Sequence, residues 1–412
     1  MHLLPDYPGS RSAILAAMLA LALVSMGCGG DAGDPGGDSL PTPIPTPTED
    51  VQEMPTATAI SPTPTFEALP ATTPPPLPTS TPVALELKAA SSTDLSWSNG
   101  DGFVGGTLTS PAMVTSGARA PAVLLIANGG GADRDWVSTS LPGDNGSGRL
   151  IASALTDAGY VTLRYDRRGT GRRIGETTPP DGENFLGDSI DEVSSAIRFL
   201  KSRPEVDPDR VYIVAHDEGA LHVLLREVQL SEPDVAGIAL LAPSALTLRQ
   251  QVFRKLGALA QEPGDEVALA ALDAAMAFFI EGDLPEGDLG LSPDLQGLFE
   301  NLTHPSKLPY NTEIWNLDPV SLLPEAGSPV LVLIGRLDSD VDWDIEGPSW
   351  EEAASIGQEV EYVYPPNADH VLKATSPDDP EIGLTTYNAS GRRLDEESLM
   401  ALLDWLNARS GL

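Results

Sequence analysis

One stretch of the chain, residues 211–221, constrains the fold more than any other. It begins with Val211-Tyr-Ile-Val214, whose β-branched and aromatic side chains predict a short buried strand. A tight turn, Ala215-His-Asp-Glu-Gly219, follows at once, and an apolar helical stretch runs from Ala220 to Val228. A sharp turn between a strand and a helix lifts its central side chain, here Asp217, above the edge of a sheet.

Strands and helices alternate along the rest of the chain. The predicted strands are 121–127, 159–166, 238–242, 330–334 and 360–364, and the predicted helices are 149–158, 191–201 and 394–408. Residues 83–111 predict two or three further strands, with turns at Asn99-Gly100 and Gly105-Gly106. Apolar residues recur at helical spacing in residues 244–323, which predicts a helical insertion. The alternation favours a mostly parallel sheet covered by helices on both faces.

Four motifs occur in order around this framework. They are Gly106-Thr-Leu-Thr-Ser-Pro111, Asn128-Gly-Gly-Gly-Ala-Asp-Arg-Asp135, Leu163-Arg-Tyr-Asp-Arg-Arg-Gly-Thr-Gly171 and Ala215-His-Asp-Glu-Gly-Ala220. Together they resemble the α/β-hydrolase superfamily, specifically a bacterial esterase-like branch with a G-H-S-E-G-G turn. The resemblance spans roughly residues 85–408 and implies an α/β-hydrolase fold, with residues 244–323 as a helical cap. This chain departs at the turn, where Asp217 replaces the nucleophilic serine and Ala215 the first glycine.

The resemblance implies a catalytic triad. Asp217 occupies the nucleophile position, and a carboxylate can form a covalent ester with a carbon electrophile, as in the related haloalkane dehalogenases and epoxide hydrolases. His370 follows the last predicted strand and matches the catalytic base. Asp338, in a G-x-x-D-x-x-V pattern, matches the acid that orients the histidine ring, and Asp340 is the alternative.

The oxyanion donors implied by the resemblance are the backbone N–H groups of Gly130 and Glu218. A carboxylate at Glu218 is also expected to repel a leaving halide, which favours epoxide or ester-like substrates. In the cap, Tyr310 and Trp315 are expected to be core residues. No cofactor is expected, and the acids between Asp338 and Asp344 are interpreted as a solvated turn because the glycine and glutamate of a calcium loop are missing.

Three functions remain open at this point. The first is hydrolysis of ester-like or carbon-electrophile small molecules through a covalent ester of Asp217. The second is ester hydrolysis by the His370–Asp338 pair without a covalent step. The third is a non-catalytic surface binding protein with a decayed nucleophile site, a hypothesis that retention of the histidine and acid disfavours.

The first 28 residues predict export. The apolar run 13–26 has about the length of a signal-peptide core and is short for a membrane span. Small residues that end at the lone Cys28 resemble a bacterial lipoprotein signal, which implies a lipid on Cys28 and an extracytoplasmic location, at the bacterial cell membrane or secreted. An uncleaved anchor and a misread start codon are the alternatives. Residues 29–82 are rich in Pro and Thr and predict a disordered linker before a hydrolase domain at 83–412.

The charge of the chain limits its partners. The formal net charge is −36, whereas binding to nucleic acid or to an anionic membrane through charge requires a basic face. We therefore expect a small-molecule substrate, no nucleic acid, and membrane contact through the lipid anchor only. The sequence does not indicate an oligomeric state.

Overall fold

The described part of the chain belongs to one compact unit. The computed structural model describes residues 87–100, 102–114, 119–129, 132–138, 141–168, 170, 185–259, 265–281, 291, 293–378 and 386–412. The predicted signal segment with Cys28 and the predicted linker lie outside these residues, and so does Gly130. No helix among the described residues combines the length and apolar character needed to cross a bilayer.

Within the described residues, eight strands form one sheet in the order β10-β9-β8-β7-β5-β6-β3-β2. The strands are β2 (Ser91–Asn99), β3 (Gly102–Ser110), β5 (Ala120–Ile126), β6 (Val161–Tyr165), β7 (Val206–His216), β8 (Gly237–Leu241), β9 (Val330–Leu333) and β10 (Val360–Val363). The six strands β10, β9, β8, β7, β5 and β6 pair with their neighbours in parallel. At the edge beyond β6, β3 pairs antiparallel with β6, and β2 pairs antiparallel with β3. Two short strands, β1 (Leu87–Lys88) and β4 (Met113–Val114), pair separately.

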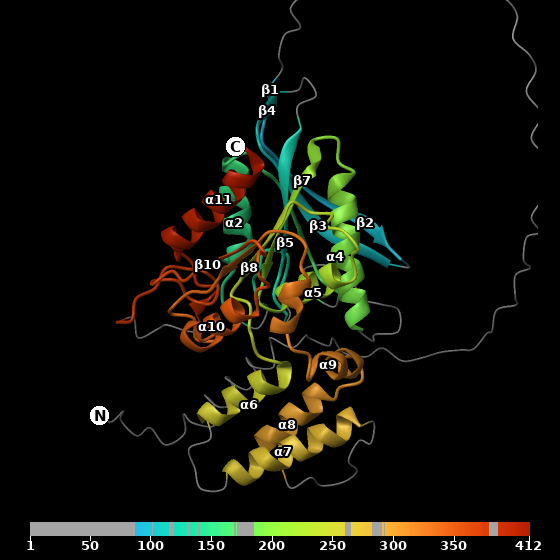
Figure 1. The fold of residues 1–412 in the computed structure, drawn as a ribbon, viewed down its shortest axis with the longest axis vertical. Helices are drawn as coiled ribbons and strands as arrows, with labels where there is room; N and C mark the ends of the chain where they lie inside the picture. The colour runs from blue at the N-terminus through green and yellow to red at the C-terminus, as the bar shows by residue number, and fades with distance from the viewer. Residues whose placement is uncertain are drawn as a thin grey trace, which may run out of the picture. The chain divides into compact units, whose positions relative to one another are not determined.

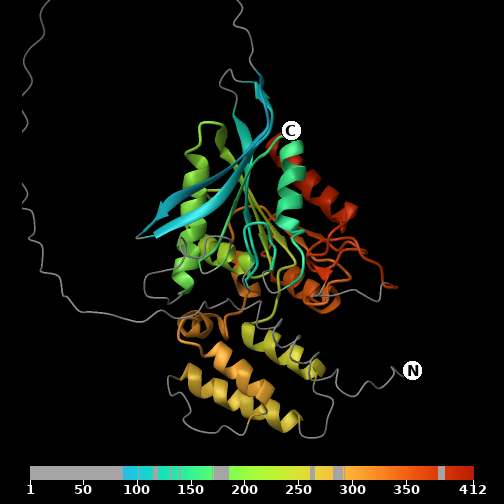
Figure 2. The same ribbon diagram turned by 180° about the vertical axis from the view of Figure 1, so that it is seen from behind.

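Helices cover both faces of the sheet. The helices α4 (Leu186–Lys201) and α5 (Glu218–Val228) lie on one face, and α2 (Ser147–Asp157) and α11 (Glu396–Ser410) lie on the other (Figure 1, Figure 2). Successive side chains of a strand point to opposite faces. In β5, Leu124 therefore packs in the α4–α5 layer, and Val123 and Leu125 pack in the α2–α11 layer. The central strands β5, β6, β8 and β9 are buried along their whole length, as the alternation of elements predicts.

The insertion is a cap of helices with its own core. It contains α6 (Leu248–Leu259), α7 (Asp265–Ile280), α8 (Pro293–Leu302), α9 (Leu308–Ile314) and the short 3₁₀ helix η1 (Val320–Glu325). Figure 1 shows α6 to α9 grouped beyond one end of the sheet. Leu272, Met276, Leu302 and Trp315 are almost completely buried in a cluster within the cap. The prediction that Trp315 is a core residue agrees with this cluster.

Two local predictions are wrong. Gly105-Gly106 is not a turn but lies inside β3, where a Cβ on Gly106 would come within 2.8 Å of the Arg164 carbonyl oxygen and 2.9 Å of the Trp97 ring. Glycine there permits close packing against the neighbouring strand and does not mark a bend. The predicted acidic turn also fails, because Asp338 is completely buried and Asp342 caps an unpredicted helix, α10 (Trp343–Ala353).

Candidate active site

The turn between β7 and α5 holds Asp217 in a strained conformation. Its backbone has φ 49° and ψ −119°, a combination that residues other than glycine rarely adopt. Such strain costs about 1–3 kcal/mol and persists where the surrounding structure imposes it. Here Asp217 donates its N–H to the Leu241 carbonyl at 2.9 Å, and its own carbonyl accepts from the N–H of Ala220 at 2.9 Å. The carboxylate makes no helix-capping bond, so it remains available above the sheet.

Gly219 allows this turn to pack against the end of β5. A Cβ at Gly219 would lie 2.7 Å from the carbonyl oxygen of Ala127, a distance that side chains do not show. Ala215, which replaces the family's first glycine, is completely buried in β7 with its methyl group accommodated by the core. The substitution at Ala215 therefore leaves the geometry of the turn intact.

His370 and Asp338 form a buried pair beside Asp217. The Nδ1–H group of His370 donates to both carboxylate oxygens of Asp338, at 3.0 and 3.1 Å. The other ring nitrogen, Nε2, lies 4.0 Å from Oδ2 of Asp217. Asp338 also accepts from the backbone N–H groups of Asp340 and Val341, at 2.7 and 2.9 Å. The structure therefore brings the three predicted triad residues together.

The charges around His370 favour its protonated form. Burial by itself lowers the pKa of His370, but the Asp338 carboxylate, with Asp340 and Asp217, raises this pKa to about 10. Burial raises the pKa of Asp338, and the imidazolium partly offsets that effect. The free protein therefore holds an imidazolium between the carboxylates of Asp338 and Asp217.

His216 holds the backbone of His370 in place. Its Nε2–H group donates to the carbonyl oxygen of His370 at 2.8 Å, and its ring stacks on Trp136 with centroids 5.1 Å apart. Burial, followed by the nearby charge of His370, lowers the pKa of His216 to about 4, so this ring is neutral. The sequence signal for this residue is its position directly before Asp217, at the end of a buried strand.

Asp340 faces the site but does not bond His370. Its Oδ1 lies 3.0 Å from the Nζ atom of Lys255, and its Oδ2 accepts from the hydroxyl of Tyr387 at 3.2 Å. Burial by itself raises the pKa of Asp340, but Lys255 and His370 lower it to about 2. Asp338, Asp340 and His370 are close enough to share a cation. Because the Lys255 ammonium already pairs with Asp340, we assign no metal to this cluster.

Glu218 belongs to a buried network on the other side of Asp217. Its Oε1 accepts from the hydroxyl of Tyr310 at 2.6 Å and from the guanidinium of Arg167 at 3.0 Å. The neutral His222 ring donates from Nε2 to the Tyr310 oxygen at 2.6 Å. Burial, followed by the nearby Arg167, lowers the pKa of His222 well below its ordinary value.

This network corrects two expectations. Arg167 compensates the Glu218 carboxylate, so the expected repulsion of a leaving halide does not follow from this residue. Tyr310 is not a plain core residue, because its hydroxyl links cap helix α9 to the first residue of α5. Its partners come from distant segments, so no sequence pattern indicated the contact.

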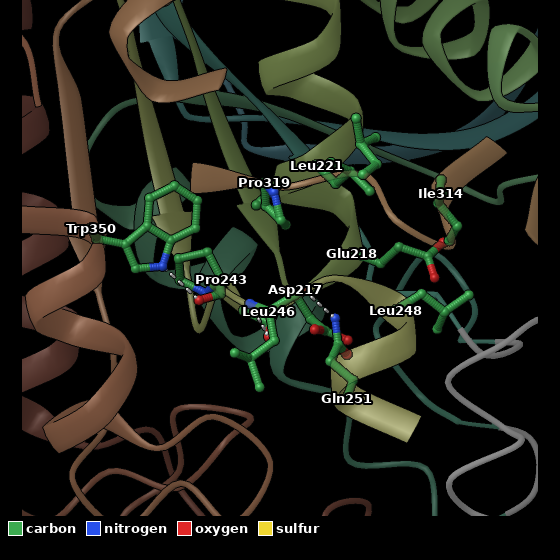
Figure 3. Close-up of a pocket in the computed structure, with 13 residues that line it drawn as sticks. Asp217, Glu218, Leu221, Pro243, Leu246, Leu248, Gln251, Ile314, Pro319 and Trp350 are labelled. Carbon is green, nitrogen blue, oxygen red and sulfur yellow. Dashed lines mark hydrogen bonds between the residues drawn. The ribbon is translucent and has the colours of Figure 1, made fainter. Parts of the chain in front are cut away.

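Two small cavities meet at Asp217. One, of about 40 Å³, includes Leu221, Leu248 and Ile314 in its wall (Figure 3). The other, of about 60 Å³, contains His370, Lys255 and Asp340 and is called the polar cavity after these groups, although Trp136, Leu141 and Val371 also line it. Gln251 of α6 borders both cavities. Both cavities therefore offer apolar and polar side chains next to Asp217.

Of the two predicted oxyanion donors, Glu218 lies among the described residues. Glu218 is the first residue of α5, so its N–H group has no partner within the helix and lies at the positive end of the helix dipole. Gly130 lies outside the described residues. Asn128, at the start of the glycine-rich segment, lines the polar cavity.

Comparisons with known proteins agree with this architecture. A sequence profile described as "Alpha/beta hydrolase family" matches residues 123–381. The chain is similar in structure to the alpha/beta hydrolase GrgF from Penicillium sp. sh18, with 16% identity over 78% of this chain and 100% of that one and a TM-score of 0.48. It is also similar to the esterase PF2001 of Pyrococcus furiosus, with 14% identity over 80% and 93% of the two chains and a TM-score of 0.49.

A third similar structure is a dienelactone hydrolase from Anabaena variabilis, with 15% identity over 78% and 97% of the two chains and a TM-score of 0.42. At these identities and scores the likenesses carry no functional information. No curated protein sequence matches this chain.

Proposed function

The chain belongs to the alpha/beta hydrolase family, and from this premise we propose that it is a hydrolase whose nucleophile is the carboxylate of Asp217. One observation carries the proposal. A strained turn holds this carboxylate 4.0 Å from Nε2 of His370, whose other nitrogen bonds the buried Asp338. That is the order of nucleophile, base and orienting acid that covalent hydrolysis requires.

The first step forms an ester on the protein. An oxygen of Asp217 attacks an electrophilic carbon, the bond between that carbon and its leaving group breaks, and the leaving group takes the electron pair. Attack on the acyl carbon of an ester would instead give an anhydride, which is a poor intermediate. The substrate class that suits a carboxylate nucleophile is therefore a small molecule with an electrophilic alkyl carbon, such as an epoxide.

The second step releases the product. His370 takes a proton from water, and the hydroxide attacks the carbonyl carbon of the Asp217 ester. The acyl C–O bond then breaks, the leaving alkoxide takes the proton from His370 and departs as an alcohol, and the Asp217 carboxyl group loses its proton to become the carboxylate again. The backbone N–H of Glu218, with that of Gly130, stabilises the oxyanion formed in this step. Esterification removes the negative charge of Asp217, which is one of the groups that raise the pKa of His370. The ring therefore loses its proton more easily once the ester has formed, when a base is needed.

Trapping of the ester tests this proposal. His370→Ala should block release while it permits attack, so incubation with an epoxide and ester panel should add substrate mass to the peptide that contains Asp217. Asp217→Ala should abolish both the adduct and turnover. Turnover that survives Asp217→Ala would exclude the covalent ester and would favour hydrolysis by His370 and Asp338 without a covalent step. If the wild type has no activity and ester cleavage appears only in Asp217→Ser, the site is a decayed one and the protein is a binding protein.

We further propose that the hydrolase is exported and tethered at the bacterial cell membrane through a lipid on Cys28, with residues 29–82 as the linker. The motif of small residues that ends at Cys28 supports this location. Metabolic labelling with a lipid precursor in a bacterial host tests it. Cys28→Ser should abolish the label, and a label that is unchanged in this variant would end the proposal.

A further inference from the structure

In-line attack by Asp217 leaves one requirement that the triad does not meet. The leaving group departs on the side of the carbon opposite to the attacking oxygen, whereas His370 lies beside that oxygen, 4.0 Å from Asp217. A leaving oxygen that departs as an alkoxide needs a hydrogen-bond or proton donor on the far side. The proposed covalent function therefore requires a residue that donates a hydrogen bond or a proton to the leaving oxygen, and the inference below rests on that function.

Helix α6 of the cap presents polar side chains to the site. Gln251, Arg254 and Lys255 lie at helical spacing on one face, and the opposite face buries Val252 and Leu256 in the cap core. The guanidinium of Arg254 bonds the carboxylate of the buried Glu346 and the backbone carbonyl of Asp340. These contacts hold α6 against the edge of the site.

Of the two residues of this face that line the polar cavity, Gln251 and Lys255, Lys255 is the charged one. It lines the same cavity as Asp217 and His370 and is the only Lys or Arg among the described residues that line either cavity. Its Nζ atom lies 3.0 Å from Oδ1 of Asp340, and its side chain is 25% exposed. An ammonium carries three N–H donors, so the single carboxylate contact leaves capacity for a ligand.

The surroundings keep Lys255 charged and oriented. Burial by itself lowers the pKa of Lys255, but Asp340 and, more weakly, Asp217 raise it above its ordinary value. Asp340 is itself held by the hydroxyl of Tyr387 at 3.2 Å. The ammonium is therefore held by Asp340 in the cavity that also contains the nucleophile, and it comes from a cap helix and not from the sheet edge.

We propose that Lys255 is the catalytic acid of the first step, which binds and protonates the oxygen that leaves when Asp217 attacks an uncharged epoxide. In this step the bond from an Asp217 oxygen to carbon forms, the ring C–O bond breaks, and its electron pair goes to the ring oxygen. That oxygen takes a proton from Nζ of Lys255 and becomes a hydroxyl. After hydrolysis of the ester, the proton on the Asp217 carboxyl group returns through solvent to the Lys255 amine.

The substrate is uncharged because of the charges already in the cavity. The carboxylates of Asp217 and Asp340 both face the cavity, so a substrate carboxylate would meet two like charges, and the two cations there, Lys255 and His370, are already paired with Asp340 and Asp338. A neutral ring oxygen gains its negative charge only as the C–O bond breaks, when Asp217 loses its own. Lys255 therefore interacts most strongly with the transition state.

Rates of adduct formation in the full-length chain test this inference. The background is His370→Ala, in which the Asp217 ester accumulates, and the probes are 1,2-epoxybutane and butyl methanesulfonate. The epoxide oxygen needs a proton as it leaves, whereas methanesulfonate leaves as a stable anion. Lys255→Met should slow adduct formation from the epoxide by about 10²-fold and from the sulfonate by less than about threefold. Lys255→Arg, which keeps the charge and the hydrogen-bond donors but cannot give up a proton, should restore only a small part of the epoxide rate.

Arg254→Gln is the matched control, because it weakens the attachment of α6 without removing a group from the cavity. It should slow both probes by a similar factor. If Lys255→Met slows adduct formation from both probes equally, the role of Lys255 is structural. If it does not slow adduct formation from the epoxide, Lys255 has no role in this step. Either result overturns the inference. If neither probe forms an adduct when Lys255 is intact, the covalent function itself fails, and the inference fails with it.

Discussion

The sheet and the cap contribute to the site in different ways. The predicted triad residues follow the carboxyl ends of β7, β9 and β10, which backbone hydrogen bonds hold in register within one parallel sheet. The cap reaches the site through side chains: Tyr310 bonds Glu218, Lys255 bonds Asp340 and Arg254 bonds Glu346. The comparison indicates that the sheet edge holds the proposed nucleophile, base and orienting acid, and that the cap adds further side chains around them. Substitutions of these three residues should therefore lower activity most, and those in the cap, Lys255 included, should lower it by smaller factors.

The largest effect is expected at Asp217. Asp217→Ala removes the nucleophile and should lower turnover by about 10⁴-fold or more, since loss of a nucleophile removes the covalent route. Asp217→Ser should instead introduce cleavage of short acyl esters, because His370, Asp338 and the Glu218 amide remain in place. Steady-state kinetics with epoxide and ester substrates measure both effects. Ester cleavage absent from a folded Asp217→Ser variant would argue against a usable oxyanion site.

Substitutions of Asp338 and of Asp340 should lower the rate of ester release to very different extents. Asp338→Asn removes the charge that orients and stabilises the His370 imidazolium, so ester release should fall by about 10³–10⁴-fold. Asp340→Asn leaves that bond intact and should lower release much less, because its partners are Lys255 and Tyr387. Single-turnover measurement of the release step separates them. Equal losses in the two variants would contradict the assignment of Asp338 as the orienting acid.

The release step should depend on pH through His370. The carboxylates around it raise the pKa of His370 in the free protein to about 10, whereas release needs the neutral ring. Below the pKa of the ester form, release should therefore rise about tenfold for each pH unit. The attack step does not use His370 as a base, so it should not rise with pH in this way. Rapid-quench measurement of both steps checks this, and a release rate that falls with rising pH would contradict it.

Two glycines test the difference in packing between sheet and cap. Gly219→Ala forces a Cβ to within 2.7 Å of the Ala127 carbonyl and should destabilise the fold by about 1–3 kcal/mol. Gly297→Ala in α8 meets nothing within 4 Å and should stabilise that helix by up to about 1 kcal/mol. Denaturant unfolding monitored by circular dichroism gives both values. Similar losses in the two variants would mean that the cap is as tightly constrained as the turn.

The smallest effect is expected at the contact between α9 and the turn. Tyr310→Phe keeps the ring but removes the hydroxyl between His222 and Glu218, at a cost of about 1–2 kcal/mol. KM should rise about five- to tenfold while kcat stays near the wild-type value. Tyr364→Phe, which removes a hydroxyl bonded to the exposed Glu351, is the control and should leave KM unchanged. A fall in kcat in the Tyr310 variant would place this contact in the chemical steps.

The sequence by itself determined the sheet and the positions of its reactive groups. Strand and helix patterns are local, so they indicated the parallel sheet directly, and the resemblance of the motifs to the α/β-hydrolase superfamily grouped Asp217, Asp338 and His370. The choice between Asp338 and Asp340 could not be made in this way. The two residues are two positions apart, and only the fold of the loop decides which one faces His370.

Only the tertiary structure decided what surrounds the triad. The pairing of Lys255 with Asp340 and of Tyr310 with Glu218 joins segments 85 or more residues apart, and no local pattern encodes such contacts. The same holds for Gly106, whose two neighbours, Trp97 and Arg164, come from different strands. The physical reason is that propensity and periodicity act over a few residues. The surroundings of a charge, and with them its pKa and its role, depend on which distant side chains the packing of the whole domain brings to it.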